Sequence, residues 1–219
     1  LILVKNKEYL NRLFESDKPL IIYKGDNCYY IYTDFSDKKI LQKSNIDNFF
    51  KKNLFSKKNT NRIFDGYIGF LGYEICCELI GIKIPKQKNS QFYKSIFYKP
   101  ETVIKINKNI LVHSTLTNFK YLQDLKKNNK KFKHQKKFKV NLTLDQYSNL
   151  FNKFSKKLKE GKTYQIKICQ KYRNQSNIDS IKFFWKLMKV NSSPESFLIR
   201  DSNYSIISCS PETLLIKNK

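Results

Sequence analysis

The chain has 219 residues, of which 40% are hydrophobic and 15% aromatic, enough for one large domain or two small ones with a sizeable core. No run of about 18 apolar residues occurs, so we expect no membrane span, and the charge that follows the short apolar N-terminus argues against a signal peptide. The formal net charge of +25 makes nucleic-acid binding the first function to test.

Lysine carries nearly all of this positive charge. Only four of the 43 basic residues are arginine: Arg12, Arg62, Arg173 and Arg200. Specific nucleic-acid binding relies on the planar arginine fork, which binds guanine and phosphate in pairs. We therefore interpret the charge mainly as coding bias on a solvated surface and expect no nucleic-acid partner. A basic module that binds nucleic acid is kept as the alternative from another class.

The cysteines and histidines form no recognisable metal or disulfide pattern. The five cysteines are Cys28, Cys76, Cys77, Cys169 and Cys209. Their number is odd and none are in CxxC spacing, which is typical of neither a disulfide framework nor a zinc site. We predict a cytoplasmic protein and no metal ligands within this chain.

The N-terminal half predicts alternating helices and hairpins. Apolar residues at helical spacing indicate a helix over 7–16. Residues 19–35 are typical of two strands that turn at 25–27, and 102–113 of a second hairpin. Between them lies a short helix over 44–53, for which Ser44 is a plausible N-terminal cap.

A glycine-rich stretch, "FDGYIGFLGYE", lies between the two predicted hairpins. Its glycines, Gly66, Gly69 and Gly72, recur every third residue. This spacing fits neither GxGxxG nor the phosphate-binding P-loop, and no Lys-Ser/Thr follows. We expect these glycines to let the backbone bend or approach another segment closely.

In the second half, a Lys/Asn-rich connector over 119–139 precedes a helix with strong end signals. Thr143 and Gln146 match a capping box, and Gly161 suits the position just past the helix end. The stretch "TYQIKICQKY", residues 163–172, alternates apolar and polar side chains, which predicts a half-buried strand.

The C-terminal part predicts one more helix and one more hairpin. Ile181, Phe184, Trp185 and Met188 share a helical face, and the helix stops before Pro194. "SFLIR" and "YSIIS" then form a hairpin about "DSN". The predicted class is α+β with much antiparallel strand.

One carboxylate is a candidate for chemistry. Glu212 follows a strand-like run within Ser-Pro-Glu, among apolar neighbours. Partial burial would raise its pKa and suit it to proton transfer, whereas an exposed loop glutamate would have no such role. The residues alone favour the interpretation that Glu212 is an exposed loop glutamate.

Four stretches, taken together, favour the interpretation that Glu212 takes part in chemistry. They are "FDGYIGFLGYEICCEL", "LKEGKTYQIKICQKY", "VNSSPESFL" and "IISCSPETLL". In order and spacing they resemble the chorismate-utilising enzymes, specifically the large subunit (component I) of aminodeoxychorismate synthase or anthranilate synthase. The first is similar to the family's "GYxGY[DE]" signature, the second to "GDxYQ" and the last to its Ser-Pro-Glu. The resemblance spans most of residues 62–216, and more weakly 19–35.

The resemblance implies a fold and a reaction. It implies part of an α/β sandwich with large antiparallel sheets, organised as an N-terminal region over 1–118, the connector over 119–140 and the start of the chorismate-binding domain over 141–219. In that family, ammonia from a partner glutaminase (glutamine amidotransferase) subunit adds to the ring of chorismate with the help of magnesium. The resemblance places Glu212 at the active site. It also implies that the magnesium ligands lie beyond Lys219, so that the chain is part of a longer protein and inactive alone.

The family's regulatory pocket separates its two branches. Anthranilate synthases carry a tryptophan pocket marked by Leu-Leu-Glu-Ser, where this chain has Ile21 and Ile22 followed by Tyr23 and Lys24. A second pocket segment, Pro followed by an aromatic residue, is matched by Pro194, Glu195 and Ser196. A cation and an acid at these positions fit an indole ring poorly. We therefore favour the aminodeoxychorismate branch, which supplies p-aminobenzoate and folate, with anthranilate synthase as the alternative, and expect the pocket equivalents to be non-functional.

Overall fold

The chain forms two compact units, comprising residues 1–128 with 180–219, and residues 129–179. The computed structural model describes residues 7–25, 27–54, 63–84, 93–116, 125, 132–133, 137–191, 193–209 and 213. Each unit is considered separately below. The predicted boundaries after residues 118 and 140 stay predictions.

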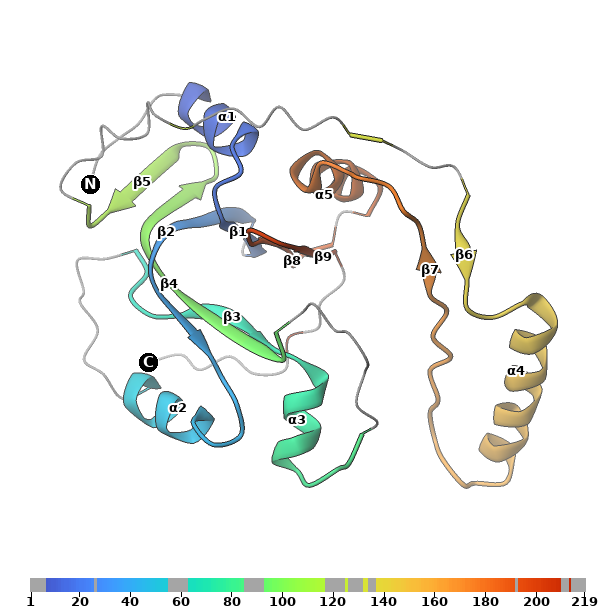
Figure 1. Cartoon of the computed structure of the whole chain (residues 1–219). Helices are drawn as coiled ribbons and strands as arrows, with labels where there is room; N and C mark the ends of the chain where they lie inside the picture. Colours follow the sequence, from blue (N-terminus) through green and yellow to red (C-terminus); the bar gives the residue numbers. More distant parts are fainter. Residues whose placement is uncertain are drawn as a thin grey trace. The chain divides into compact units, whose positions relative to one another are not determined.

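The first unit is built on a seven-stranded antiparallel sheet (Figure 1). Its strands are β1 (Leu20–Gly25), β2 (Cys28–Ile40), β3 (Ile68–Leu71), β4 (Ser95–Ile106), β5 (Ile110–Ser114), β8 (Ser196–Arg200) and β9 (Ser205–Ser208). The order is β3-β4-β2-β1-β8-β9. Strand β5 also pairs with β4, over residues 102–106, whereas β3 pairs with residues 95–98. The predicted α+β class with antiparallel strands is confirmed.

The hairpin turns lie where the sequence predicts them. Asn27, between β1 and β2, has a φ of 58°, a left-handed conformation that asparagine adopts more readily than most residues. Between β4 and β5, the side chain of Asn107 accepts a hydrogen bond from the backbone of Asn109 at 2.9 Å. Such local contacts fix the turn and therefore the strand register.

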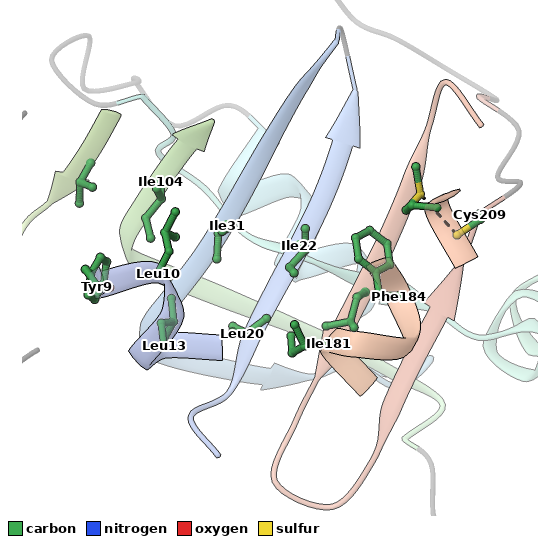
Figure 2. Packing of buried hydrophobic residues seen from close by; sticks show 13 residues of the cluster. Tyr9, Leu10, Leu13, Leu20, Ile22, Ile31, Ile104, Ile181, Phe184 and Cys209 are labelled. Atoms are coloured by element: carbon green, nitrogen blue, oxygen red, sulfur yellow. Dashed lines mark hydrogen bonds between the residues drawn. The ribbon is translucent and has the colours of Figure 1, made fainter. Parts of the chain in front are cut away.

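Two helices cover one face of this sheet and enclose the main core (Figure 2). Helix α1 (Lys7–Glu15) contributes Leu13, and helix α5 (Ser180–Val190) contributes Phe184; neither side chain is exposed to solvent. Between the helices and the strands lie Leu20, Ile22, Ile31, Ile104 and Leu198. The predicted inward faces of both helices are confirmed.

The opposite face of the sheet carries a second apolar cluster, and a third lies beside the edge of β4. The second cluster contains Ile21, Tyr32, Ile96, Tyr98, Val103 and Ile199. The third joins helix α2 (Ile46–Leu54) to helix α3 (Tyr73–Leu79) through Ile46 and Ile75. Since α2 begins at Ile46, the residue directly before it is Asn45, and Ser44 is not in the predicted cap position.

The glycine-rich stretch brings β3 unusually close to β4. A Cβ atom added at Gly69 would lie 2.0 Å from the carbonyl oxygen of Ile96, and one at Gly72 would lie 2.5 Å from that of Lys94. Only glycine therefore fits at these two positions. At Gly66 an added Cβ would meet only the Phe64 ring, at 3.7 Å. The predicted role in close backbone approach is confirmed for Gly69 and Gly72.

The second unit contains helix α4 (Leu144–Lys159) and a short ladder between β6 (Lys139–Val140) and β7 (Tyr172–Arg173). The capping box is confirmed, because Thr143 and Gln146 exchange hydrogen bonds at 3.0 and 3.3 Å. Gly161 adopts a φ of 68°, as expected just past a helix end. The predicted connector over 119–139 falls largely outside the described residues.

The predicted strand over 163–172 is wrong. Residues 163–171 adopt no strand conformation, and only Tyr172 at its end joins a ladder. Tyr164, expected to face a core, is 95% exposed. Alternating apolar residues form a strand only where a neighbouring strand pairs with their backbone, and none of the strands in the described part of this unit does so.

Candidate functional site

Pairing between β1 and β8 brings together the residues expected to correspond to the regulatory pocket. The two strands run antiparallel, with Tyr23 opposite Phe197 and Lys24 opposite Ser196. Glu195 immediately precedes β8. Segments from the two ends of the chain thus become neighbours, as the interpretation of a shared pocket requires.

These residues do not all face the same side of the sheet. The Tyr23 hydroxyl donates to Glu195 Oε1 over 3.4 Å, so these two side chains share a face. Successive side chains of a strand point to opposite faces, so Lys24 points to the other one. Its ammonium donates to the carbonyl oxygen of Ser193 at 2.6 Å. Tyr23 and Lys24 therefore cannot line the same pocket.

The two remaining residues are occupied in other ways. Ser196 is fully buried, and its hydroxyl donates to the carbonyl oxygen of Glu195 at 2.7 Å. Pro194 is exposed. Apart from Pro194, the pocket equivalents thus bond to groups of the chain itself. Whether they bind a regulator stays a prediction.

A second polar cluster, centred on Asp201, was not anticipated from the sequence. Asp201 lies in the turn between β8 and β9 and is 8% exposed. One carboxylate oxygen accepts hydrogen bonds from the Lys38 ammonium at 2.7 Å and from the Tyr98 hydroxyl at 2.5 Å. The other accepts one from the Ser202 backbone at 2.7 Å. The Lys38 ammonium also lies 5.1 Å from the centre of the Tyr93 ring.

This environment keeps Asp201 charged and Tyr98 neutral. Burial by itself would raise the pKa of Asp201, but hydrogen bonds from Lys38 and Tyr98 outweigh it and hold the pKa below its usual value. Burial, and then the hydrogen bond to Asp201, raise the pKa of Tyr98. A carboxylate with both oxygens occupied is poorly suited to proton transfer, so we assign the cluster to stabilising the β8–β9 turn against β2 and β4. The "DSN" turn was its only signal in the sequence.

Glu212, the predicted catalytic residue, lies outside the described residues. The chain leading to it is anchored on α5. Cys209 is buried with its sulfur 3.6 Å from that of Met188 (Figure 2). Its carbonyl oxygen accepts a hydrogen bond from the Asn191 side chain at 3.1 Å. The role of Glu212 stays a prediction.

The described residues contain no group of three histidine, cysteine or carboxylate side chains that could hold a metal ion. A magnesium ligand set therefore cannot be assembled from them. All five cysteines are free thiols. Among the helices of the described part of the chain, none is long and apolar enough to cross a membrane.

Comparison with known proteins gives the class of this chain. Residues 9–219 match the family of chorismate binding enzymes, and the chain belongs to that family. The resemblance drawn from the four sequence stretches is confirmed.

One known protein is similar to this chain over most of the chain's length. The chain is similar to anthranilate synthase component 1 of Buchnera aphidicola subsp. Pemphigus spyrothecae, with 27% identity over 228 aligned residues. The match covers 94% of this chain and 42% of the relative, so the chain spans less than half the relative's length.

Proposed function

We propose that this chain belongs to component I of an aminodeoxychorismate synthase, which aminates chorismate with ammonia from a glutaminase subunit. Family membership supports the chorismate chemistry. The branch is supported by one observation: the positions equivalent to a tryptophan pocket hold a phenol bonded to a carboxylate and, on the opposite face, an ammonium bonded to a carbonyl group. An indole ring on the Tyr23 face would have to displace the contact between Tyr23 and Glu195, two half-buried groups.

In this proposal Glu212 transfers protons. Replacing the ring hydroxyl of chorismate requires a donor for the leaving oxygen and a base for the attacking nucleophile. A partly desolvated carboxyl group can serve either role, because burial raises its pKa toward neutrality. Magnesium would offset the two carboxylates of chorismate. The described residues offer no ligands for it, so we assign it no step here.

Anthranilate synthase component I is the second candidate. The Buchnera relative carries that name, which directly favours this branch. Both branches use the same substrate and ammonia source. They differ in the position of the new amino group and in the fate of the enolpyruvyl side chain, which aminodeoxychorismate keeps and which leaves as pyruvate when anthranilate forms.

The test is product identity. The complete coding sequence that contains this chain is expressed, mixed with a glutaminase subunit, glutamine, magnesium and chorismate, and the products are separated by chromatography. We expect aminodeoxychorismate; anthranilate would establish the second candidate, and the absence of any aminated product would refute both. If the purified protein instead bound RNA with an affinity that fell steeply with salt, the basic-module alternative would gain support.

The role of Glu212 is tested in the same assay. Glu212→Gln keeps the shape of the side chain and removes its acid–base function, so we expect turnover to fall by about a hundredfold or more. Glu78→Gln is the matched control, because Glu78 is partly exposed and pairs with Lys94 on the surface. Turnover close to the parent rate in Glu212→Gln would return Glu212 to an ordinary loop glutamate.

A further inference from the structure

A pocket of about 170 Å³ lies between α2, the segment before β3, and β4. Four aromatic rings line it. Phe49 is central, with its ring centre 5.4 Å from that of Phe50, 5.0 Å from Tyr67 and 5.4 Å from Phe97. The rings meet edge-on or tilted, which is the arrangement that aromatic rings favour.

The volume matches one six-membered ring. A protein cavity of about 150 Å³ with apolar walls is large enough to hold benzene. The pocket is open to solvent on one side, so the substituents of a ring seated in it can extend outward.

The pocket also has polar groups that specify the ligand's substituents. Lys99, Asn53 and Asp65 line the same space as the rings. The Lys99 ammonium complements a carboxylate, and the excess of positive charge over the whole chain favours an anion approaching the surface. Asp65 suits a substituent that donates a hydrogen bond, such as an amino group.

The walls are held in place before any ligand arrives. The Tyr67 hydroxyl donates to Asp37 at 2.6 Å, which fixes the ring. Burial, together with this hydrogen bond, raises the pKa of Tyr67 to about 12, so the hydroxyl stays a donor at neutral pH. Gly69, two residues after Tyr67, lets the backbone of β3 pack closely against that of β4. A preformed site binds with less loss of conformational entropy than one that must be ordered.

We propose that this pocket binds a small molecule with a single aromatic ring and a carboxylate, and that an amino group on the ring strengthens binding. The pocket is separate from the residues paired across β1 and β8, because β2 lies between β4 and β1 in the sheet. The proposal rests on the pocket's own geometry and is independent of the proposed catalytic function.

The test is binding of benzoate and 4-aminobenzoate to the 219-residue chain, measured by saturation-transfer NMR and isothermal calorimetry. Cyclohexanecarboxylate, with the same charge and no aromatic ring, is the control ligand. We expect saturable binding of both aromatic acids, tighter for 4-aminobenzoate, and weaker binding of cyclohexanecarboxylate. Equal binding of all three acids would show attraction to charge alone and overturn the proposal, as would no binding.

Three variants locate the site. Lys99→Gln removes the cation, and we expect it to weaken benzoate binding by about tenfold or more, the scale of a charged hydrogen bond. Lys51→Gln, on an exposed position of the same helix as Phe49, should leave binding unchanged. Phe50→Leu should weaken it, because it keeps apolar bulk and removes a ring; circular dichroism checks that it folds. Equal affinities in Lys99→Gln and Lys51→Gln would place any binding elsewhere and refute the assignment.

Discussion

Replacing Gly69 with alanine tests whether the glycine-rich stretch is needed for backbone approach. The added methyl carbon would lie 2.0 Å from the Ile96 carbonyl oxygen and 2.7 Å from the Phe97 Cα atom. A carbon and a carbonyl oxygen normally approach to about 3.3 Å, so β3 would have to move away from β4 by about 1.3 Å. Both contacts are with backbone, which cannot rotate aside as a side chain can.

The cost follows from that displacement. Moving β3 by about 1.3 Å stretches ladder bonds that start near 2.9 Å beyond the normal limit of about 3.2 Å. Each lost bond costs about 0.5–1.5 kcal/mol, and overpacking a tight site costs about 1–3 kcal/mol. We therefore expect Gly69→Ala to lower the free energy of unfolding by about 2–4 kcal/mol. At about 2–4 °C per kcal/mol, the melting temperature should fall by about 4–16 °C.

The assay is urea and thermal unfolding of the 219-residue chain, followed by circular dichroism. Gly66→Ala is the matched control, since its added methyl group would meet only the Phe64 ring at 3.7 Å, an ordinary contact. We expect this control to stay within about 0.5 kcal/mol of the parent chain. If the two variants were equally stable, the close approach of β3 to β4 would not be what requires glycine.

Three further predictions concern the buried polar cluster, the main core and the regulatory positions. Because the folded-state pKa of Asp201 is lowered, its charge stabilises the fold above about pH 4, and this contribution is lost as the pH falls through the folded-state pKa. Asp201→Asn should therefore lower the free energy of unfolding by about 1–3 kcal/mol at pH 7, and the variant should lose less stability in acid than the parent chain. Urea titrations at pH 7 and pH 3 would reveal this, and parallel pH profiles for variant and parent would refute it. Phe184 has no exposed surface, so Phe184→Ala should lower the free energy of unfolding in urea by about 3–5 kcal/mol. A decrease of less than about 1 kcal/mol would argue against the central place of Phe184 in the core. Tryptophan should leave the melting temperature unchanged, whereas a true ligand at a hundredfold excess over its dissociation constant would add about 2.7 kcal/mol, and a clear upward shift would count against the aminodeoxychorismate branch.

Much of this protein's local structure is determined by the sequence alone, because the forces involved act over a few residues. The capping box of Thr143 and Gln146 depends on contacts within a single helical turn. The turn at Asn27 depends on the conformational preference of one residue. The family was also recognisable from the order of four short stretches, since each keeps its residues together along the chain.

Only the tertiary structure decided which segments meet. Nothing in the sequence around Tyr23 shows that β8 would pair with β1, or that Lys24 would face away from Glu195. The alternation over 163–172 predicted a strand, yet a strand forms only when a distant segment supplies the backbone partner. The aromatic pocket has the same origin: Phe49, Tyr67 and Phe97 lie on three separate segments, and only sheet pairing and helix packing place their rings about 5 Å apart.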